Sequence, residues 1–458
     1  MRYCSTRGSA PELGFTDTLL AGLAPDGGLY VPDHWPSLPP VDRGVDYADT
    51  AATIMSPYIG GELSDDALLS MCREAYGTFR HPAVAPLVQI DEHQWVLELF
   101  HGPTLAFKDV ALQLVGRLFD HVLAERGERI TIVGATSGDT GSAAIDGVRG
   151  CSNVDIVILY PSGRTSDVQR RQMTTVDAPN VHTVAIDGTF DDCQDMVKAM
   201  FEDPLLRSEL RLSAVNSINW ARVMAQVVYY VTASTSLAGP VRFSVPTGNF
   251  GNVLAGWIAR HMGAPILDFI VASNANDILA RFIEHGDMSI GQVVPTLSPS
   301  MDIQVSSNFE RLLFEMDGRN GSVTSDRLAR FRSSGRLDVS DSSIDEWIRG
   351  SFRAVRIDDD ATLDEIARVH AECGMLIDPH TATATAAARV HSDGADVISL
   401  ATAHPAKFPD AVERATGHRP ELPAALGDLM EREERIRELP ADLAAVTAFV
   451  RSVSRVSR

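Results

Sequence analysis

Lysine is scarce in this sequence. Only three of its 40 lysines and arginines are lysines, namely Lys108, Lys198 and Lys407. Arginine can supply charge and hydrogen bonds, but only lysine carries an amine that loses its proton near neutral pH and attacks a carbonyl group. If this protein forms an imine, one of these residues carries it. The alternative is a composition biased toward arginine, in which three lysines remain by chance.

Cysteine patterns of disulfide frameworks and metal sites are also missing. The five cysteines, Cys4, Cys72, Cys151, Cys193 and Cys373, are scattered and odd in number, and none forms a CxxC spacing. This usage predicts a reducing compartment and no structural zinc. We therefore expect no metal in the protein.

Long apolar runs and long basic runs are absent as well. No stretch approaches the ~20 apolar residues of a membrane helix, and the first thirty residues lack a signal-like apolar core. The net charge of −21 argues against nucleic acids and anionic membranes as partners. We expect a cytoplasmic protein. An anionic small molecule stays a candidate ligand, because backbone amides and a few arginines can outweigh a repulsive overall field.

The sequence has enough apolar material for more than one core. With 45% hydrophobic residues over 458 positions, it predicts two or three domains. From Val96 onward, strand patterns alternate with helix patterns, which is typical of parallel sheets. We expect several strands, at 129–135, 154–159, 181–186, 241–245, 269–272 and 397–400. We also expect helices at 140–148, 190–201 and 253–262.

The surroundings of the three lysines differ. Lys198 lies in an amphipathic helix pattern that turns it toward solvent. Lys108 begins a stretch with an apolar residue every four positions, ended by Gly127, so it lies near a helix start. The helix dipole and partial burial there lower the pKa of an amine, although Asp109 acts in the opposite direction. Lys407 lies in a proline-punctuated loop and is the second candidate.

A glycine-containing loop, 246–252, follows one expected strand and precedes a helix. Its glycines let backbone amides turn toward an anion, and the helix N-terminus adds a favourable potential, so the loop suits a phosphate. It has neither the GxxxxGK[ST] spacing of a Walker loop nor a GxGxxG spacing, which disfavours a nucleotide-binding protein. A plain glycine turn is the alternative.

Two further strand-loop-helix segments suit anions. Residues 134–141 place hydroxyls and amides at a helix start, and residues 161–171 combine arginines with hydroxyls after a strand. Ordinary loop turns and solvent-facing arginines are the alternatives. Anion cradles and one privileged lysine on the same α/β scaffold point to an aldehyde cofactor with a phosphate group. Pyridoxal phosphate fits that description.

Several motifs together resemble the threonine synthase family. They are HGPTLAFKD at 101–109, the loop 135–141, NSINWAR at 216–222, TGNFGN at 247–252, the segment 298–309 and ATAHPAKF at 401–408. The opening YCSTRG at 3–8 and PDGGLY at 25–30 are similar to the longer form of the family, which has an extra N-terminal domain. The resemblance covers nearly the whole chain.

This resemblance implies a fold-type II pyridoxal-phosphate enzyme of the α/β class, similar to the tryptophan synthase β subunit. Large and small parallel-sheet domains would hold the cofactor between them, beside a mainly helical N-terminal domain. We place the N-terminal domain at 1–90, the small domain at 135–215 and the large domain at 91–134 and 216–458.

The resemblance also implies roles for individual residues. Lys108 would form the imine with the cofactor. The cofactor phosphate would lie on the glycine loop, at Gly248, Asn249, Phe250, Gly251 and Asn252. Thr402 would face the pyridine nitrogen, where a neutral hydroxyl leaves the nitrogen largely unprotonated. Asp139 stands where many relatives have Asn, which puts its contact with the cofactor in doubt. The substrate carboxylate would bind to Ser137, Gly138 and Thr140, and the substrate phosphate to Arg164 and Ser166.

The implied reaction converts O-phospho-L-homoserine and water to L-threonine and phosphate, by γ-elimination followed by addition of water at Cβ. A phospho-lyase on the same scaffold, giving 2-oxobutyrate from phosphohomoserine or phosphothreonine, is the main alternative. A non-catalytic binding protein is the other, although the lysine and the glycine loop are intact. The sequence leaves open whether the protein is a monomer or a homodimer.

Overall fold

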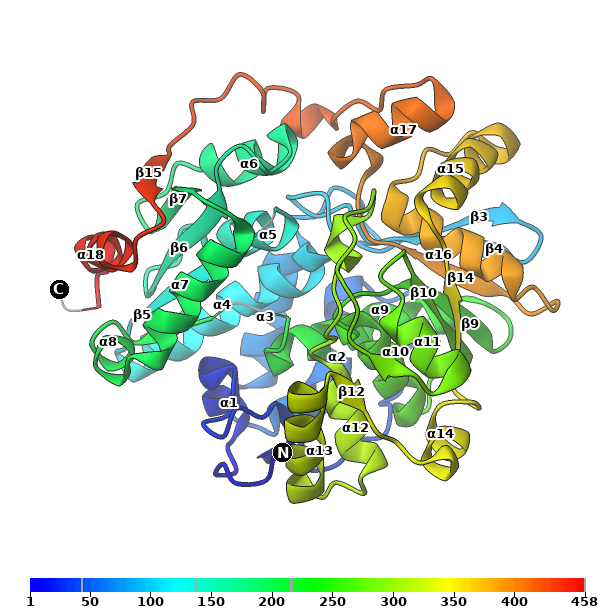
Figure 1. Cartoon of the computed structure of the whole chain (residues 1–458), viewed down its shortest axis with the longest axis horizontal. Helices are drawn as coiled ribbons and strands as arrows, with labels where there is room; N and C mark the ends of the chain where they lie inside the picture. The colour runs from blue at the N-terminus through cyan, green and yellow to red at the C-terminus, as the bar shows by residue number, and fades with distance from the viewer. Residues whose placement is uncertain (43, 137, 215–216, 457–458) are drawn as a thin grey trace.

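The computed structural model describes residues 1–42, 44–136, 138–214 and 217–456. Two sheets with helices on their faces organise the chain (Figure 1). The larger sheet has the order β13-β10-β9-β14-β4-β3, and every pairing in it is parallel except that of β3 with β4. In that order, its strands span Phe352–Arg356, Ile266–Ser273, Val241–Pro246, Val397–Ala401, Gln94–Glu98 and Leu87–Asp91.

The smaller sheet has the order β15-β7-β6-β5-β8, with all pairings parallel. Its strands span Arg437–Pro440, Val181–Asp187, Val154–Pro161, Ile130–Ala135 and Leu212–Ser213. The strand β6 is buried along its whole length, as expected of a strand covered on both faces. The helices of this part are α5 (Asp139–Val148), α6 (Asp167–Thr174), α7 (Phe190–Glu202), α8 (Pro204–Glu209) and α18 (Leu443–Val453).

Helices also cover the larger sheet. They include α4 (Lys108–Arg126), α9 (Trp220–Ser236), α10 (Gly251–Met262), α11 (Ile278–His285), α15 (Asp359–Cys373) and α16 (Pro379–Val390). Beyond them lie α12 (Phe309–Met316), α13 (Gly321–Ser334), α14 (Asp341–Trp347) and α17 (Pro409–Thr416). The short 3-10 turns are η1 (Pro299–Met301), η2 (Pro405–Lys407) and η3 (Ala424–Leu426). The strand β11 (Met288–Ser289) pairs with β12 (Arg336–Leu337). The small residues of α16 let it pack closely on the sheet, where the Ser244 hydroxyl donates to the carbonyl oxygen of Ala384 at 2.7 Å.

All the strands and helices predicted above are present, with ends shifted by a few residues. The division between the two sheets differs from the predicted one in two places. The strand β5 lies wholly in the smaller sheet, and the C-terminal β15 and α18 also pack there, because β15 pairs with β7. That return of the chain depends on a distant pairing, which local sequence patterns do not reveal.

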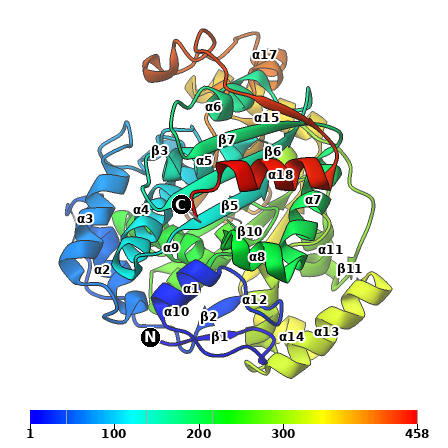
Figure 2. The same ribbon diagram turned by 90° about the vertical axis from the view of Figure 1, so that its left-hand side faces the viewer.

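The N-terminal unit consists of β1 (Tyr3–Ser5), α1 (Phe15–Ala21), β2 (Tyr30–Pro32), α2 (Tyr47–Ile59) and α3 (Asp65–Tyr76). The helix α1 packs against α2, α4 and α9, and Figure 2 shows β1 and β2 near α12. The unit shares one apolar core with the larger sheet. The Tyr3 hydroxyl donates to the carbonyl of Tyr58 at 2.7 Å and accepts from the Trp220 indole at 3.1 Å. Thr6 and Arg7 both bind Glu310 of α12.

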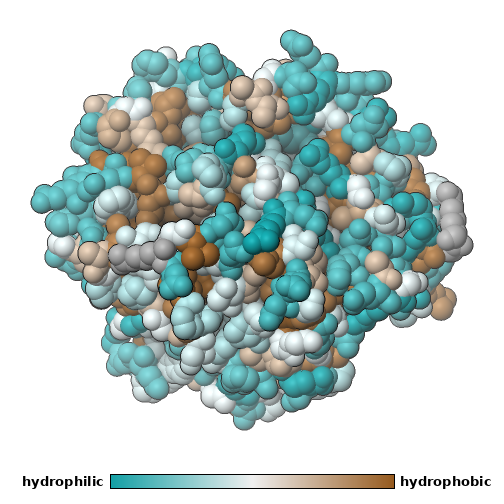
Figure 3. Space-filling model, turned by 180° about the vertical axis from the view of Figure 1, so that it is seen from behind, coloured by the Kyte–Doolittle hydropathy of each residue, from teal (hydrophilic) through white to brown (hydrophobic). Residues whose placement is uncertain are grey.

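Among the described residues, no helix is both long and apolar enough to cross a membrane. Figure 3 shows the rear of the molecule, where apolar residues lie in separate groups among hydrophilic ones. The apolar side chains are therefore mostly gathered in the interior rather than in one continuous patch on that face.

The helices α4 and α5 cross at two glycines. A Cβ atom on Gly116 would lie 1.9 Å from the carbonyl oxygen of Gly147, and one on Gly147 would lie 2.4 Å from that of Leu112. Because α4 begins at Lys108 and α5 at Asp139, this contact fixes how the two helix starts face each other.

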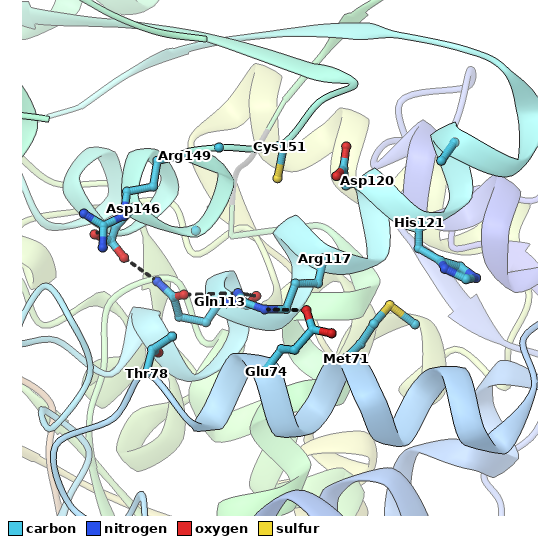
Figure 4. A pocket seen from close by; sticks show the side chains of 13 residues that line it. Met71, Glu74, Thr78, Gln113, Arg117, Asp120, His121, Asp146, Arg149 and Cys151 are labelled. Carbon is cyan, nitrogen blue, oxygen red and sulfur yellow. Dashed lines mark hydrogen bonds and ion pairs between the residues drawn. The ribbon is translucent and has the colours of Figure 1, made fainter. Parts of the chain in front are cut away.

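A hollow of about 440 Å³ lies beside this crossing, between α3, α4 and α5 (Figure 4). Its acidic groups already have protein partners. Asp146 accepts from Gln113 at 2.7 Å, and Asp120 accepts from the backbone of Asn153 at 2.9 Å. Figure 4 shows Glu74 turned toward Arg117, 3.8 Å away. These internal pairs engage the three acidic side chains of the lining.

We predict that Gly147→Ala destabilises the protein by about 1–3 kcal/mol, because the added methyl group overlaps backbone atoms of α4. In a helix with free space around the glycine, the same change usually stabilises the protein by about 0.5–1 kcal/mol. A loss of stability would therefore indicate that α4 and α5 approach closely at Gly147. Urea unfolding would measure it. Gly239→Ala is the matched control, because a Cβ there meets nothing within 4 Å. Equal stability of the two variants would contradict the close crossing.

Candidate active site

The site forms where three parallel strands of the larger sheet end. The strand β14 lies between β9 and β4, so the segments that follow these strands meet at one edge. The segment after β14 runs along the segment that leads into α4. The backbone N–H of Phe107 donates to the carbonyl oxygen of Thr402 at 2.9 Å, and the backbone N–H of His404 donates to the carbonyl oxygen of Leu105 at 3.0 Å. Thr402 is thereby held beside the start of α4, next to Lys108.

Lys108 is the first residue of α4, as predicted, and its side chain is almost wholly buried. Its Nζ lies 3.2 Å from Oδ2 of Asp139. Burial lowers the pKa of the Lys108 amine, the charge of Asp139 raises it, and the charges of Lys407 and Arg222 lower it again. The net direction is downward, which favours a nucleophilic amine.

Asp139 is bound by three side chains. Its Oδ2 accepts from Lys108, and its Oδ1 accepts from Lys407 at 2.6 Å and from Nε2 of Gln169 at 2.8 Å. Burial alone would raise the pKa of Asp139, but the two ammonium groups and these hydrogen bonds hold it well below its ordinary value. Asp139 is therefore a carboxylate at neutral pH.

The other two lysines are placed differently. Lys198 is exposed and pairs with Asp195, which confirms the prediction of a surface charge. Lys407 does lie in a proline-punctuated turn, but it is fully buried and reaches the same carboxylate as Lys108. Its sequence context gave no sign of this contact. Asp109 does not act on the Lys108 amine as expected, because its carboxylate instead accepts from the backbone and hydroxyl of Thr104, at 2.8 and 2.6 Å.

The loop between β9 and α10 has the features of an anion cradle. None of the described residues offers a hydrogen-bond acceptor to the backbone N–H groups of residues 248–252. Two residues outside the loop support it. The hydroxyl of Ser306 donates to the carbonyl oxygen of Gly248 at 2.8 Å, and the backbone N–H of Asn308 donates to the carbonyl oxygen of Asn249 at 3.1 Å. Unpaired N–H groups at a helix N-terminus suit a phosphate.

Asn252 adds a further donor to this loop. Its Oδ1 accepts from the hydroxyls of Tyr229 and Tyr230, which leaves Nδ2 buried and without a partner among the described residues. A buried unpaired donor costs about 1–3 kcal/mol unless something binds it. The loop therefore fits a bound anionic group.

Two non-glycine residues at the site have left-handed backbones, Leu105 with φ 63° and Phe250 with φ 59°. Leu105 lies three residues before Lys108, the first residue of α4, and Phe250 is the N-cap of α10. Such conformations cost roughly 1–3 kcal/mol each and are concentrated at functional sites. Here each one directs the start of a helix toward the shared strand edge.

The loop after β5 is held by Thr136, whose hydroxyl accepts from the N–H groups of Gly138 and Gly141, at 3.0 and 2.9 Å. Gly138 has φ 152°, and a Cβ on it would overlap the side chain of Gln169. Thr140 is half-buried in the first turn of α5. Ser137, a predicted carboxylate ligand, lies outside the described residues.

The loop after β6 carries Arg164 and Ser166, and both are exposed. The Ser166 hydroxyl caps α6 and donates to Oε1 of Gln169 at 3.0 Å, while Nε2 of Gln169 binds Asp139. Gln169 thus links this loop to the lysine site. Gln169 lies in the segment 161–171, which the sequence indicates as a candidate anion loop. A glutamine at this position did not by itself predict a contact with Asp139.

Arg222 was not among the predicted site residues. It is 3% exposed, and its Nε and Nη1 have no partner among the described residues. Burial lowers the pKa of Arg222 to about 10. The charge of Arg222, near the start of α9, contributes to lowering the pKa of Lys108. The motif 216–222 contained it, and an arginine in an otherwise apolar helix face was the available signal.

Comparisons with known proteins agree with this geometry. The family model described as threonine synthase N terminus matches residues 2–76, that of pyridoxal-phosphate dependent enzymes matches 79–402, and that of the threonine synthase C-terminal region matches 381–450. The threonine synthase of Pseudomonas aeruginosa is 55% identical over 460 residues, covering 98% of each chain.

Solved structures are similar over almost the whole chain. The pyridoxal-phosphate-bound threonine synthase of Brucella melitensis superposes with a TM-score of 0.97 at 53% identity, covering 99% of this chain and 100% of the other. The yeast threonine synthase gives a TM-score of 0.92 at 39% identity, covering 99% and 98%.

We predict a pH-dependent role for Asp109. Burial raises its pKa to about 6, so the folded state binds its proton more tightly than the unfolded state does. The stability that this proton supplies is complete below about pH 4 and is lost as the pH rises through 6. Between pH 4 and 7, the wild type should therefore lose about 2 kcal/mol of unfolding free energy relative to Asp109→Asn.

Urea unfolding at several pH values would measure this difference. Asp195→Asn, on the exposed face of α7, is the control and should run parallel to the wild type. A difference between wild type and Asp109→Asn that does not change with pH would contradict the raised pKa.

Proposed function

Because the chain belongs to the threonine synthase family, we propose that it converts O-phospho-L-homoserine and water to L-threonine and phosphate. It is a pyridoxal-phosphate-dependent enzyme of fold type II. The observation that carries the proposal is the buried Lys108 amine, which pairs with Asp139 at the strand edge where β9 leads into the anion cradle.

The residues present fit the cofactor. The unpaired N–H groups of 248–252 and the amide of Asn252 suit its phosphate, and Thr402, held beside the start of α4, suits the pyridine nitrogen. When bound, pyridoxal phosphate supplies an aldehyde for the lysine amine and a ring that withdraws electrons from the bonds at the substrate Cα. We propose that Asp139 lies beside the cofactor while remaining bound to Lys407.

We assign the proton transfers to Lys108. Once its amine is displaced by that of the substrate, it is a base with a lowered pKa and can remove a proton from Cα and then from Cβ. The γ-phosphate then leaves with its electron pair, one proton is delivered to Cγ, water adds its hydroxyl group at Cβ and yields its proton to the released phosphate, and Lys108 returns a proton to Cα. The two protons taken from Cα and Cβ are thus replaced at Cγ and Cα. Burial on the larger sheet keeps bulk water from the amine.

The anionic groups of the substrate need separate partners. We propose that the loop at Ser137, Gly138 and Thr140 binds the carboxylate. For the phosphate, the two candidates are the exposed pair Arg164 and Ser166 and the buried Arg222. The Nε and Nη1 groups of Arg222, which have no partner among the described residues, favour it, because a buried guanidinium that lacks an anion is costly. Arg164 and Ser166 would then contribute when the smaller sheet approaches the larger one.

We also propose that the enzyme works in the cytoplasm on this small-molecule substrate. All five cysteines are free, which supports a reducing compartment. The strongly negative net charge supports the absence of nucleic-acid partners.

The proposed reaction predicts one product balance. With phosphohomoserine as substrate, threonine should appear in equal amount to phosphate, and Lys108→Ala should lower the rate by a factor of about 10³ or more, since it removes the base and the imine. Separate assays of phosphate, threonine and 2-oxobutyrate would test this, with Lys198→Ala as the matched control. Release of 2-oxobutyrate in place of threonine would establish a phospho-lyase instead.

The two phosphate candidates can be separated by kinetics. We expect Arg222→Leu to lower kcat/KM for phosphohomoserine by about 30-fold or more, as for other buried charge pairs that lose one member. Arg164→Leu should have a smaller effect because its side chain is solvated. Circular dichroism would confirm that both variants fold. A larger loss in Arg164→Leu than in Arg222→Leu would reverse the assignment.

A further inference from the structure

We propose that Lys407 is a positioning residue: its ammonium group serves as the permanent counter-ion of Asp139, so that Lys108 can release and regain its proton without leaving a buried carboxylate unpaired. This deepens the proposed function and rests on it for the role of Lys108. The placement of the charges, however, can be tested without any turnover.

The contacts of Lys407 are those of a fixed charge. Its side chain is fully buried, and Nζ lies 2.6 Å from Oδ1 of Asp139 and donates to the carbonyl oxygen of Thr104 at 2.9 Å. The turn η2 that carries it is fixed too, since Nδ1 of His404 accepts from the N–H of Ala406 at 3.1 Å. No rearrangement is needed for Lys407 to bind Asp139 when Lys108 moves away.

The two lysines use different oxygens of the carboxylate. Lys407 and Gln169 occupy Oδ1, whereas Lys108 contacts Oδ2 at the longer distance of 3.2 Å. When both lysines are protonated, the group of three carries a net charge of +1. When Lys108 loses its proton, a neutral ion pair of Lys407 and Asp139 remains. A buried neutral pair is far less costly than a buried single charge.

Removing Lys407 would make deprotonation of Lys108 the costly step. Asp139 would then depend on Lys108 alone, and deprotonation of Lys108 would leave the carboxylate buried without a counter-ion. Lys108 would therefore hold its proton to a higher pH. Two effects act in the same direction, the loss of repulsion between the ammonium groups and the stronger dependence of Asp139 on Lys108.

The other charged groups nearby do not take the place of Lys407 as the counter-ion of Asp139. Arg222 approaches from α9 and acts on Lys108 as a like charge. Asp109 on α4 is another buried carboxylate, but its oxygens accept from Thr104 rather than from Lys108 or Lys407. The carbonyl of that same Thr104 also accepts from Gln172. Among the described side chains, Lys407 is the one ammonium besides Lys108 that binds Asp139.

The scarcity of lysine makes the test clean. The apoenzyme, freed of pyridoxal phosphate, would be treated briefly with acetic anhydride at a series of pH values, and the acetylation of each of its three lysines would be followed by peptide mass spectrometry. The pH at half-maximal labelling rate reports the proton affinity of Lys108. The readout does not depend on catalysis, so it separates this proposal from the proposed function.

We expect Lys407→Met to raise the midpoint of Lys108 by about one pH unit or more. Asp139→Asn should lower it, because Lys108 loses its partner and keeps the repulsion of Lys407. The double variant should return toward the wild type, since it removes a neutral pair. Lys198→Gln is the matched control, because it removes an exposed lysine on another helix and should leave the midpoint unchanged.

An unchanged or lowered midpoint in Lys407→Met would overturn the proposal. If that variant does not fold, as judged by circular dichroism, the comparison of Asp139→Asn with the double variant decides. The double variant should then have the higher midpoint, because Lys407 is absent from it. Equal midpoints would show that the charge of Lys407 does not act on Lys108, and the proposal would fail.

Discussion

The active site depends on one buried carboxylate that is shared by two lysines. Asp139 binds Lys108 through one oxygen and Lys407 through the other, and Gln169 completes its contacts. Burial would otherwise neutralise such a group, and the two ammonium charges reverse that tendency. Because the carboxylate persists, it fixes the position of the Lys108 amine, whose pKa is lowered by burial.

The fold brings these charges together from distant parts of the chain. The close crossing of Gly116 and Gly147 sets the starts of α4 and α5 against each other, and the parallel order of β4, β14 and β9 brings their following loops to one edge. The N-terminal unit supports the same edge. Arg311 donates to the carbonyl oxygens of Tyr30 and Ile218, and its neighbour Asn308 holds the anion cradle. That unit is thus part of the structure that shapes the site.

The sequence predicted the elements well and placed Lys108 at a helix start, because both rest on local patterns. Strand and helix periodicity, and the apolar repeat that begins at Lys108, depend on residues that are neighbours in the chain. The missed features depend on contacts between distant segments. Lys407 meets Asp139, Arg222 is buried with its Nε and Nη1 unpaired among the described residues, and β15 joins β7. In each case the local pattern is that of an ordinary loop, helix or tail. Residues 137 and 215–216 of the predicted motifs lie outside the described part of the chain.

The most direct test of the account is to identify the lysine that binds the cofactor. Reduction of the pyridoxal-phosphate-loaded enzyme with borohydride would fix the cofactor to its lysine, and peptide mass mapping would locate it. The two buried lysines lie on the same carboxylate, so this measurement tells the reactive amine from its counter-ion. The account predicts the label on Lys108 alone. A label on Lys407 would contradict it, because the two residues would then have exchanged their roles.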